Sequence, residues 1–222
     1  MDHFSVSCAR PFLVAEFSAP QAVLSWSLTR PGFAVARKVA WLHVRDDDLP
    51  LGVDPAALLE TRMAAAGHRD AVHLMTSRDV GHHHLATASS GAAAAACLAT
   101  VGLGNAARVG SAPLIGKPLG TINLLAHVDR PLSQGALVEA VSIATQARTA
   151  AVIDLDLRLD GKPVTGTGTD CIVVAAPAMD GGDAFAGLHT DIGAAIGRAV
   201  YEAVWQGGSA WIGERRELAV AR

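Results

Sequence analysis

The segment Thr165–Asp170, with the sequence TGTGTD, concentrates small polar side chains directly before an apolar run. Its two glycines let backbone amides approach a ligand, while the threonine hydroxyls and the Asp170 carboxylate are short polar groups. The run that follows, Cys171–Ala176, reads CIVVAA and is typical of a strand buried on both faces. A polar entrance to a buried strand favours a functional site, and the alternative is a tight turn in which Asp170 bonds to its own backbone.

A second segment, GLHTD at Gly187–Asp191, places His189 just before an expected helix. The free N–H groups of a first helical turn can hold an anion or an oxyanion, and an imidazole can transfer a proton. The competing interpretation is that Thr190 caps the helix and that His189 is incidental. Taken alone, the segment favours capping.

The sequence GLGNAA at Gly102–Ala107 has the spacing of a dinucleotide-binding loop, although a lone match is weakly diagnostic. The helix that such a loop requires would meet Pro113 and Pro118, and the nearest acidic residue downstream is Asp129. A nucleotide-binding protein of the Rossmann type therefore stays only as an alternative.

Histidines gather at His82, His83 and His84, with His68 and His73 before them. In an extended segment, His82 and His84 would share a face and could bind a metal ion. No carboxylate or cysteine completes a recognisable spacing, and a histidine run in a polar loop is more often solvated. We therefore predict no metal site and no other cofactor, with a metal requirement left open.

The composition excludes several classes of protein. Half of the 222 residues are hydrophobic and 18% are charged, so the chain can build a core and is not disordered. The 18 Lys and Arg residues against 21 Asp and Glu residues give a net charge of -3, which predicts no nucleic-acid partner.

Two features bear on the location of the protein. The longest apolar run, residues 92–103, is shorter than the ~18–20 residues that span a bilayer, so no membrane insertion is expected. No secretory signal is visible, and Cys8, Cys97 and Cys171 are an odd set without metal-type spacing. We therefore expect a cytoplasmic protein.

Three segments have the sequence features of helices. Residues 54–67 run from an Asp-Pro start to a glycine stop, and residues 133–150 are amphipathic. A third helix is expected from the cap at residue 190 to a stop at Gly207, with Gly193 allowing close approach to its backbone.

Strands are more numerous. Residues 153–159 alternate apolar and charged side chains before an Asp-Gly turn, which predicts a strand and a hairpin. The runs at 93–101 and 171–176 predict buried strands, although the length of the first also allows a buried helix. A loop is expected at 110–120. Other strands are expected at residues 13–27, 35–44, 71–76 and 120–128. About eight strands to three helices predict a single α+β or mixed α/β domain over residues 1–222, with helices packed on a largely antiparallel or mixed sheet.

Read together, four motifs resemble the adenosylcobinamide amidohydrolase family. They are GLGNAARVG at 102–110, the segment from GTINLLAHV to VIDL at 120–155, TGTGTDCIVVAAP at 165–177 and AGLHTDIGAAIGRAVYEAV at 186–204. They occur in the order and at the spacing of the family, and HLMTSRDV at 73–80 resembles it too. The similarity extends over roughly residues 23–204, with a looser match at its beginning.

The resemblance implies a reaction. The family hydrolyses the amide that joins the aminopropanol arm to the corrinoid ring of adenosylcobinamide, which releases adenosylcobyric acid in cobalamin salvage. The corrinoid would be the substrate and partner rather than a cofactor, and the subunits could form a homo-oligomer. A corrinoid-binding module without catalysis is the other alternative.

The motifs also suggest roles for individual residues. We expect His189 to act as general base and then acid, oriented by Asp170, while Asn105 and the amides of residues 167–169 stabilise the oxyanion. Direct attack by water is expected. Thr169 as a covalent nucleophile is the alternative, and it would need an activating group that the sequence does not show. The thiol of Cys171 ranks below water, because it lies at the start of a buried strand. Six further residues are expected to bind substrate: Thr167, Thr190, Arg108, Asn123, Asp79 and Trp41.

Overall fold

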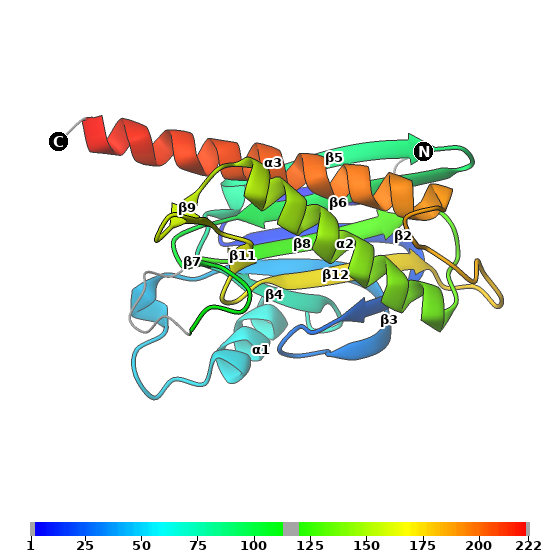
Figure 1. Cartoon of the computed structure of the whole chain (residues 1–222). Coiled ribbons are helices and arrows are strands. Elements are labelled where there is room, and N and C mark those ends of the chain that lie inside the picture. The colour runs from blue at the N-terminus through cyan, green and yellow to red at the C-terminus, as the bar shows by residue number, and fades with distance from the viewer. Residues whose placement is uncertain (1–2, 113–119, 221–222) are drawn as a thin grey trace.

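The computed structural model describes residues 3–112 and 120–220, so most of the expected loop at 110–120 lies outside the described residues. The described part contains an eight-stranded sheet and three α-helices (Figure 1). The helices are α1 (Pro55–Ala65), α2 (Gln134–Asp154) and α3 (Asp191–Val220). The strands of the sheet are β1 (Ser5–Ala9), β2 (Phe12–Ser25), β3 (Gly32–His43), β4 (Val72–Thr76), β5 (His83–Ser90), β6 (Ala93–Val101), β8 (Ile122–Val128) and β12 (Cys171–Pro177).

The sheet is mixed. Its strands are ordered β4-β3-β2-β12-β8-β6-β5, and β1 pairs with β2. The β3–β4 and β8–β12 pairs are parallel, and the other pairs are antiparallel. The predicted class, helices packed on a mixed sheet in one α+β domain, is confirmed.

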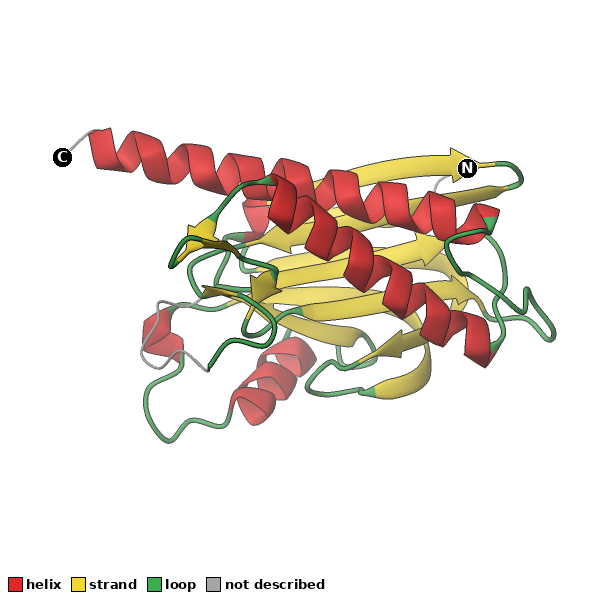
Figure 2. Cartoon of the chain, viewed as in Figure 1, coloured by secondary structure: helices red, strands yellow, loops and turns green. Residues whose placement is uncertain are grey.

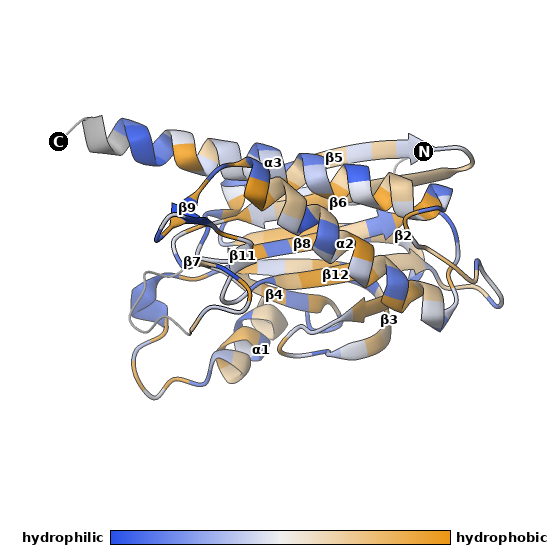
Figure 3. Ribbon diagram, in the orientation of Figure 1, coloured by the Kyte–Doolittle hydropathy of each residue, from blue (hydrophilic) through white to orange (hydrophobic). Residues whose placement is uncertain are grey.

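Helices α2 and α3 lie side by side on one face of the sheet (Figure 2). Alternate residues of the central strands point toward them, as the two-residue period of a strand requires, and Leu124 and Val174 are buried there. The strand β12 is apolar along nearly its whole length (Figure 3), because its other face is buried as well. The continuously apolar runs in the sequence therefore do mark the centre of the fold.

On the opposite face, the two ends of the sheet fold toward each other and pack together. The register of β2 with β3 shifts between Glu16 and Gln21, and β2 pairs with β1 before this shift and with β12 after it. Residues of β3 and β4 thus pack against those of β6, β8 and β12 in a second core that includes Trp41 and Leu125. Helix α1 lies on the far side of β3, where its Leu59 contributes to a third apolar cluster.

The start of α1 follows the predicted cap, and the start of α2 has a cap that was not predicted. The Asp54 carboxylate accepts a hydrogen bond from Ala56 N at 2.9 Å, and the Ser133 hydroxyl accepts one from Ala136 N at 3.1 Å. Gly67 has a φ of +78°, the left-handed conformation expected after a helix end. Capping depends on neighbours two or three residues away, so the sequence alone is sufficient to locate it.

Helix α2 is the one helix within the described residues that is long and apolar enough to cross a membrane by length and composition, with a mean hydropathy of 1.2. A core helix passes the same test, and here α2 packs on the sheet and on α3.

The predicted strand at 153–159 is wrong. Helix α2 continues through Asp154, and only β9 (Arg158–Leu159) is extended, paired with β10 (Lys162–Pro163). The predicted turn is confirmed, since Asp160 and Gly161 have φ values of +51° and +76°. Leu155, Leu157 and Leu159 pack on the main core along an irregular path, so their alternation reflects burial rather than a strand.

The predicted stop of α3 at Gly207 is also wrong, because the helix runs to Val220. A Cβ atom on Gly207 would lie 2.7 Å from Cγ2 of Val101, a fully buried residue of β6. The glycine therefore allows close packing of helix on sheet and is not a helix terminator.

This contact predicts opposite signs for two substitutions in α3. Gly207→Ala should destabilise the protein by ~1–3 kcal/mol, because overpacking against Val101 outweighs the better helix propensity of alanine. Gly213→Ala should stabilise it by up to ~1 kcal/mol, because a Cβ atom there meets no atom within 4 Å. Urea unfolding of both variants tests this, and a stable Gly207→Ala protein would contradict the packing argument.

Candidate active site

Three loops meet at one end of the sheet. Strands β8 and β12 are parallel to each other, and β6 is antiparallel to β8. The end of β6 therefore lies at the same edge of the sheet as the starts of β8 and β12. The loop after β6 leads into β7 (Ala106–Ala107), which pairs with β11 (Gly166–Thr167). Since a strand and not a helix follows the glycine loop at 102–107, the Rossmann alternative is wrong.

The packing of these loops is close. A Cβ atom on Gly120 would lie 2.6 Å from the amide nitrogen of Gly104 and 2.9 Å from that of Asn105. Only glycine fits between β8 and the loop that carries Asn105, and this contact places the two motifs together.

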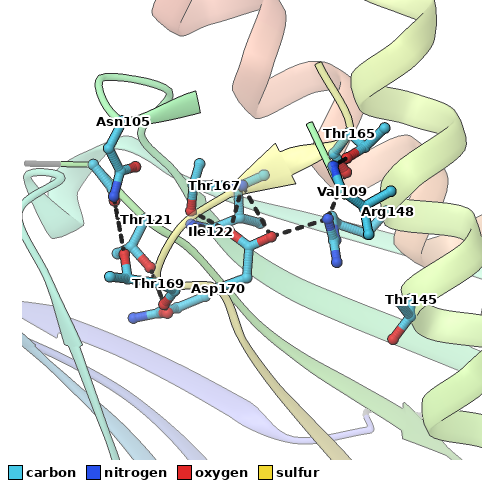
Figure 4. Close-up of polar contacts among 12 residues, drawn as sticks. Asn105, Val109, Thr121, Ile122, Thr145, Arg148, Thr165, Thr167, Thr169 and Asp170 are labelled. Carbon is cyan, nitrogen blue, oxygen red and sulfur yellow. Dashed lines mark hydrogen bonds and ion pairs between the residues drawn. The ribbon is translucent and has the colours of Figure 1, made fainter. Parts of the chain in front are cut away.

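Asp170 is held by hydrogen bonds from three elements (Figure 4). Its Oδ1 accepts from the Thr167 hydroxyl, from Thr167 N at 3.2 Å and from Ile122 N at 3.2 Å. Its Oδ2 lies 3.0 Å from Arg148 Nη1 and also accepts from Thr167 N at 3.2 Å. With both oxygens occupied and the side chain only 8% exposed, the carboxylate holds the turn and has no free site for a substrate.

Arg148 was missed by the sequence analysis. Its guanidinium, 12% exposed, also donates to Thr165 O at 2.6 Å. Burial raises the pKa of the Asp170 carboxyl, while the Arg148 charge and the hydrogen bonds oppose that rise. A signal was present, because Arg148 follows Leu137, Val141 and Ala144 on the apolar face of α2, where an unpaired charge would be costly.

Thr169 and Asn105 form the polar end of the site. Asn105 Nδ2 donates to the Thr169 hydroxyl at 3.3 Å, and that hydroxyl donates to Gly120 O at 2.9 Å. The Thr121 hydroxyl lies 2.7 Å from Thr169 O and 3.1 Å from Asn123 Oδ1. Asn123 Nδ2 donates to Met75 O at 2.6 Å, which ties β8 to β4.

Thr121, Asn123, Thr169 and Asp170 line a cleft of about 480 Å³, and Asn105 is connected to it through its hydrogen bond to Thr169. One wall is apolar and the other is the polar end described above. The apolar lining residues are Trp26, Leu28, Val44, Pro55, Leu74 and Met75, and the polar ones are Ser27, His73, Ser77, Thr121, Asn123, Thr169, Asp170 and Cys171. A mostly apolar cleft with a few convergent polar groups is typical of a small-molecule site.

His73 is the one histidine among the described lining residues of the cleft. Its Nε2 lies 2.8 Å from His68 O, and its Nδ1 lies 3.0 Å from the Thr29 hydroxyl. A carbonyl oxygen only accepts, so Nε2 carries the hydrogen and Nδ1 has the lone pair when the ring is neutral. The Thr29 hydroxyl, the His73 imidazole as a base and the His68 carbonyl that orients the imidazole thus form one hydrogen-bonded series.

His189 and Thr190 lie away from the cleft. Nearby Ala186 N donates to Glu139 Oε2 at 2.7 Å, and Glu139 precedes Arg148 by nine residues of α2, or ~13 Å. The start of α3 and strand β11 accordingly appear at opposite ends of the sheet in Figure 1. The expected pair of His189 and Asp170 is not formed.

Thr190 caps helix α3, which is the alternative to a functional role of the GLHTD segment. Its hydroxyl accepts from Gly193 N at 2.9 Å, and a Cβ atom on Gly193 would lie 2.1 Å from Gly187 O. The expected close approach at Gly193 is confirmed, and it is the chain's own loop that approaches.

Of the six residues expected to bind substrate, Asn123 lines the cleft and Thr167 supports it through Asp170. Trp41 is fully buried in the second core, so its expected contact with substrate is wrong. Asp79 binds Arg10 at 2.7 Å on the surface, which lowers the pKa of its carboxyl to about 2. Arg108 donates to Pro163 O at 2.9 Å and is not among the residues of the cleft.

The histidine run is not in a polar loop. His83 and His84 begin β5, and His82 Nδ1 lies 3.0 Å from Glu214, which also pairs with Arg78. Within residues 3–112 and 120–220, no three His, Cys, Asp or Glu side chains are placed to hold a metal ion. Cys171 lines the cleft, where burial raises the pKa of its thiol to about 12, which makes it a poor nucleophile.

The chain resembles several known proteins. It is 36% identical over 153 residues to an adenosylcobinamide amidohydrolase of Halobacterium salinarum, covering 64% of this chain and 62% of that protein. It is 37% identical over 89 residues to an uncharacterized protein of Methanocaldococcus jannaschii, covering 39% of this chain and 34% of that protein. The chain thus spans less than two thirds of the length of both relatives.

Two solved structures are also similar. A β-aminopeptidase of a Burkholderia species matches with a TM-score of 0.44 and 15% identity, over 88% of this chain and 78% of that one. A protein of Pyrococcus horikoshii matches with a TM-score of 0.46 and 11% identity, over 88% of this chain and 76% of that one. The sequence profile of the adenosylcobinamide amidohydrolases covers residues 1–216, beyond the expected 23–204, and the chain belongs to this family.

Proposed function

We propose that this protein hydrolyses the amide between the aminopropanol arm and the corrinoid ring of adenosylcobinamide and releases adenosylcobyric acid, in cytoplasmic corrinoid salvage. Membership of the family and the name of the Halobacterium relative support the reaction class. The observation that carries the proposal is the hydrogen bond from Asn105 to Thr169, because Thr169 lies at the polar end of a mostly apolar cleft.

In this proposal the pair binds the substrate carbonyl. Asn105 Nδ2 has two hydrogens and uses one on Thr169, so the second can be donated to the carbonyl oxygen as it becomes an oxyanion. The Thr169 hydroxyl donates to a carbonyl oxygen, which is not a base, and is therefore assigned to orientation rather than to covalent attack.

The base is reassigned from His189 to His73, the imidazole that lines the cleft. A water oxygen forms a bond to the amide carbon while its proton passes through the Thr29 hydroxyl to His73 Nδ1. As the C–N bond breaks, the imidazolium returns this proton to the amine nitrogen. The net change is amide plus water to acid plus amine, with no redox step.

Incubation of the purified protein with adenosylcobinamide, with and without a chelator, tests the proposal. Mass spectrometry should show adenosylcobyric acid and free aminopropanol. Tight binding without product would identify the non-catalytic corrinoid-binding module instead, and activity lost to the chelator and restored by a metal would add a metal to the site.

Asn105→Ala tests the oxyanion role. We expect a ~10²-fold lower kcat with little change in KM, because one donor to an oxyanion contributes ~3 kcal/mol. If Asn105 instead only supports its loop, the variant would show a lower thermal unfolding temperature with nearly normal kcat. A pure KM effect would make Asn105 a residue that binds the ground state of the substrate.

A further inference from the structure

Trp26 presents an aromatic face at the mouth of the cleft. It follows directly after β2, its side chain is 46% exposed, and it lines the cleft. Its indole N–H donates to the backbone oxygen of Asp170 at 2.8 Å. The polar edge of the ring is therefore satisfied, and its orientation is tied to the turn that carries Thr169.

Apolar side chains extend this surface. Leu28, two residues further on, is 57% exposed, and Val44, Pro55, Leu74 and Met75 are the other apolar residues that line the cleft. Large apolar side chains exposed together at a cleft indicate a binding surface, whereas scattered ones do not. The surface is thus built for a flat or broad apolar group.

The ionisable side chains that line the cleft indicate which charge a ligand can carry. Among its described lining residues there is no lysine or arginine, and its ionisable groups are His73, Asp170 and Cys171. A phosphate-bearing group would lack a cationic partner on these residues. A corrinoid that holds Co(III) presents a broad hydrocarbon macrocycle with a positive charge, and an aromatic face attracts such a cation.

The volume of the cleft indicates how much of a corrinoid can enter it. Pockets for drug-sized ligands have ~300–1,000 Å³, and a corrinoid with its amide side chains is larger than such ligands. A cleft of about 480 Å³ admits only the edge of the ring that bears the scissile amide. The rest of the ring must lie at the mouth, where Trp26 and Leu28 are exposed.

We propose that Trp26 is the platform on which the face of the corrin ring rests while the amide-bearing edge reaches Asn105 and Thr169. This inference rests on the proposed function and adds the residue that selects the ring. It assigns Trp26 to the corrin and not to the adenine of the adenosyl group.

The test is the binding of hydroxocobinamide, which lacks the adenosyl group, to three variants. Trp26→Ala should raise Kd ~10-fold, and Trp26→Phe should stay within ~3-fold of the wild type, because a phenyl ring keeps an aromatic face. Trp205→Ala is the matched control, since Trp205 is 41% exposed on α3 and does not line the cleft; its Kd should not change. Thermal unfolding of each variant checks that the fold is kept.

Several results would overturn the platform. Trp26→Ala could bind hydroxocobinamide as tightly as the wild type, or the wild type could fail to bind it. A loss confined to adenosylcobinamide would assign Trp26 to the adenine instead. If the wild type hydrolyses adenosylcobinamide while Trp26→Ala has an unchanged Kd, this inference fails and the proposed function stands.

Discussion

Asp170→Asn is expected to abolish measurable turnover and to destabilise the fold by ~3–5 kcal/mol, because it leaves the buried Arg148 charge without its partner. An asparagine also replaces one accepting oxygen by an NH2 group, which faces the N–H groups of Thr167 or Ile122. The turn that carries Thr169 would then lose its position, and small displacements of catalytic groups reduce rates strongly.

A double-mutant cycle separates the ion pair from other effects. Arg148→Met removes the positive partner of the ion pair. The double variant with Asp170→Asn should lose less free energy of unfolding than the sum of the two single variants, because neither charge is then left unpaired. Urea unfolding and kcat of all four proteins provide the cycle. His189→Ala, at the other end of the sheet, is the control and should retain nearly normal turnover. A fully active Asp170→Asn enzyme with unchanged stability would refute the role assigned to this carboxylate.

His73→Gln is expected to lower kcat by ~10²–10⁴-fold, the usual effect of removing a general base. Glutamine can still donate to His68 O and accept from Thr29, so packing is kept while the basic nitrogen is lost. Thr29→Val should show a similar loss, and Thr29→Ser should recover most of the rate because it restores the hydroxyl. Steady-state kinetics of the three variants are the measurement.

Two outcomes would count against this assignment of the base. A His73→Gln enzyme with normal kcat would show that the imidazole takes no proton. A trapped acyl adduct on Thr29 or Thr169, found by mass spectrometry with a slow substrate, would replace water attack by covalent catalysis. His84→Gln is a suitable control, since His84 lies in β5 and outside the cleft.

The sequence was sufficient for features that depend on near neighbours. The caps at Asp54 and Thr190 and the turn at Asp160 each involve contacts within a few residues. Continuous apolar runs likewise identified β6 and β12, because a strand buried on both faces has no polar alternation.

The predictions from sequence were wrong where a contact with a distant segment determined the structure of a local pattern. Gly207 resembles a helix stop, yet it is required by Val101 of β6. Residues 153–159 alternate like a strand, yet the leucines fill the core around the end of a longer helix. Local propensity is a weak preference, and packing decides between its alternatives.

The polar motifs that contain Asn105, Asn123, Thr169 and Asp170 could be recognised from the sequence, because glycines and short polar side chains before a buried strand form a local pattern. The residues that accompany these motifs come from distant segments and could be identified only in the folded chain. Thr29 and His73 are 44 positions apart and meet because β4, which carries His73, pairs with β3, and Thr29 lies in the turn that leads into β3. Arg148 arrives from α2. The expected proximity of His189 and Asp170 fails, because the 30-residue helix α3 begins at the opposite end of the sheet and holds His189 there.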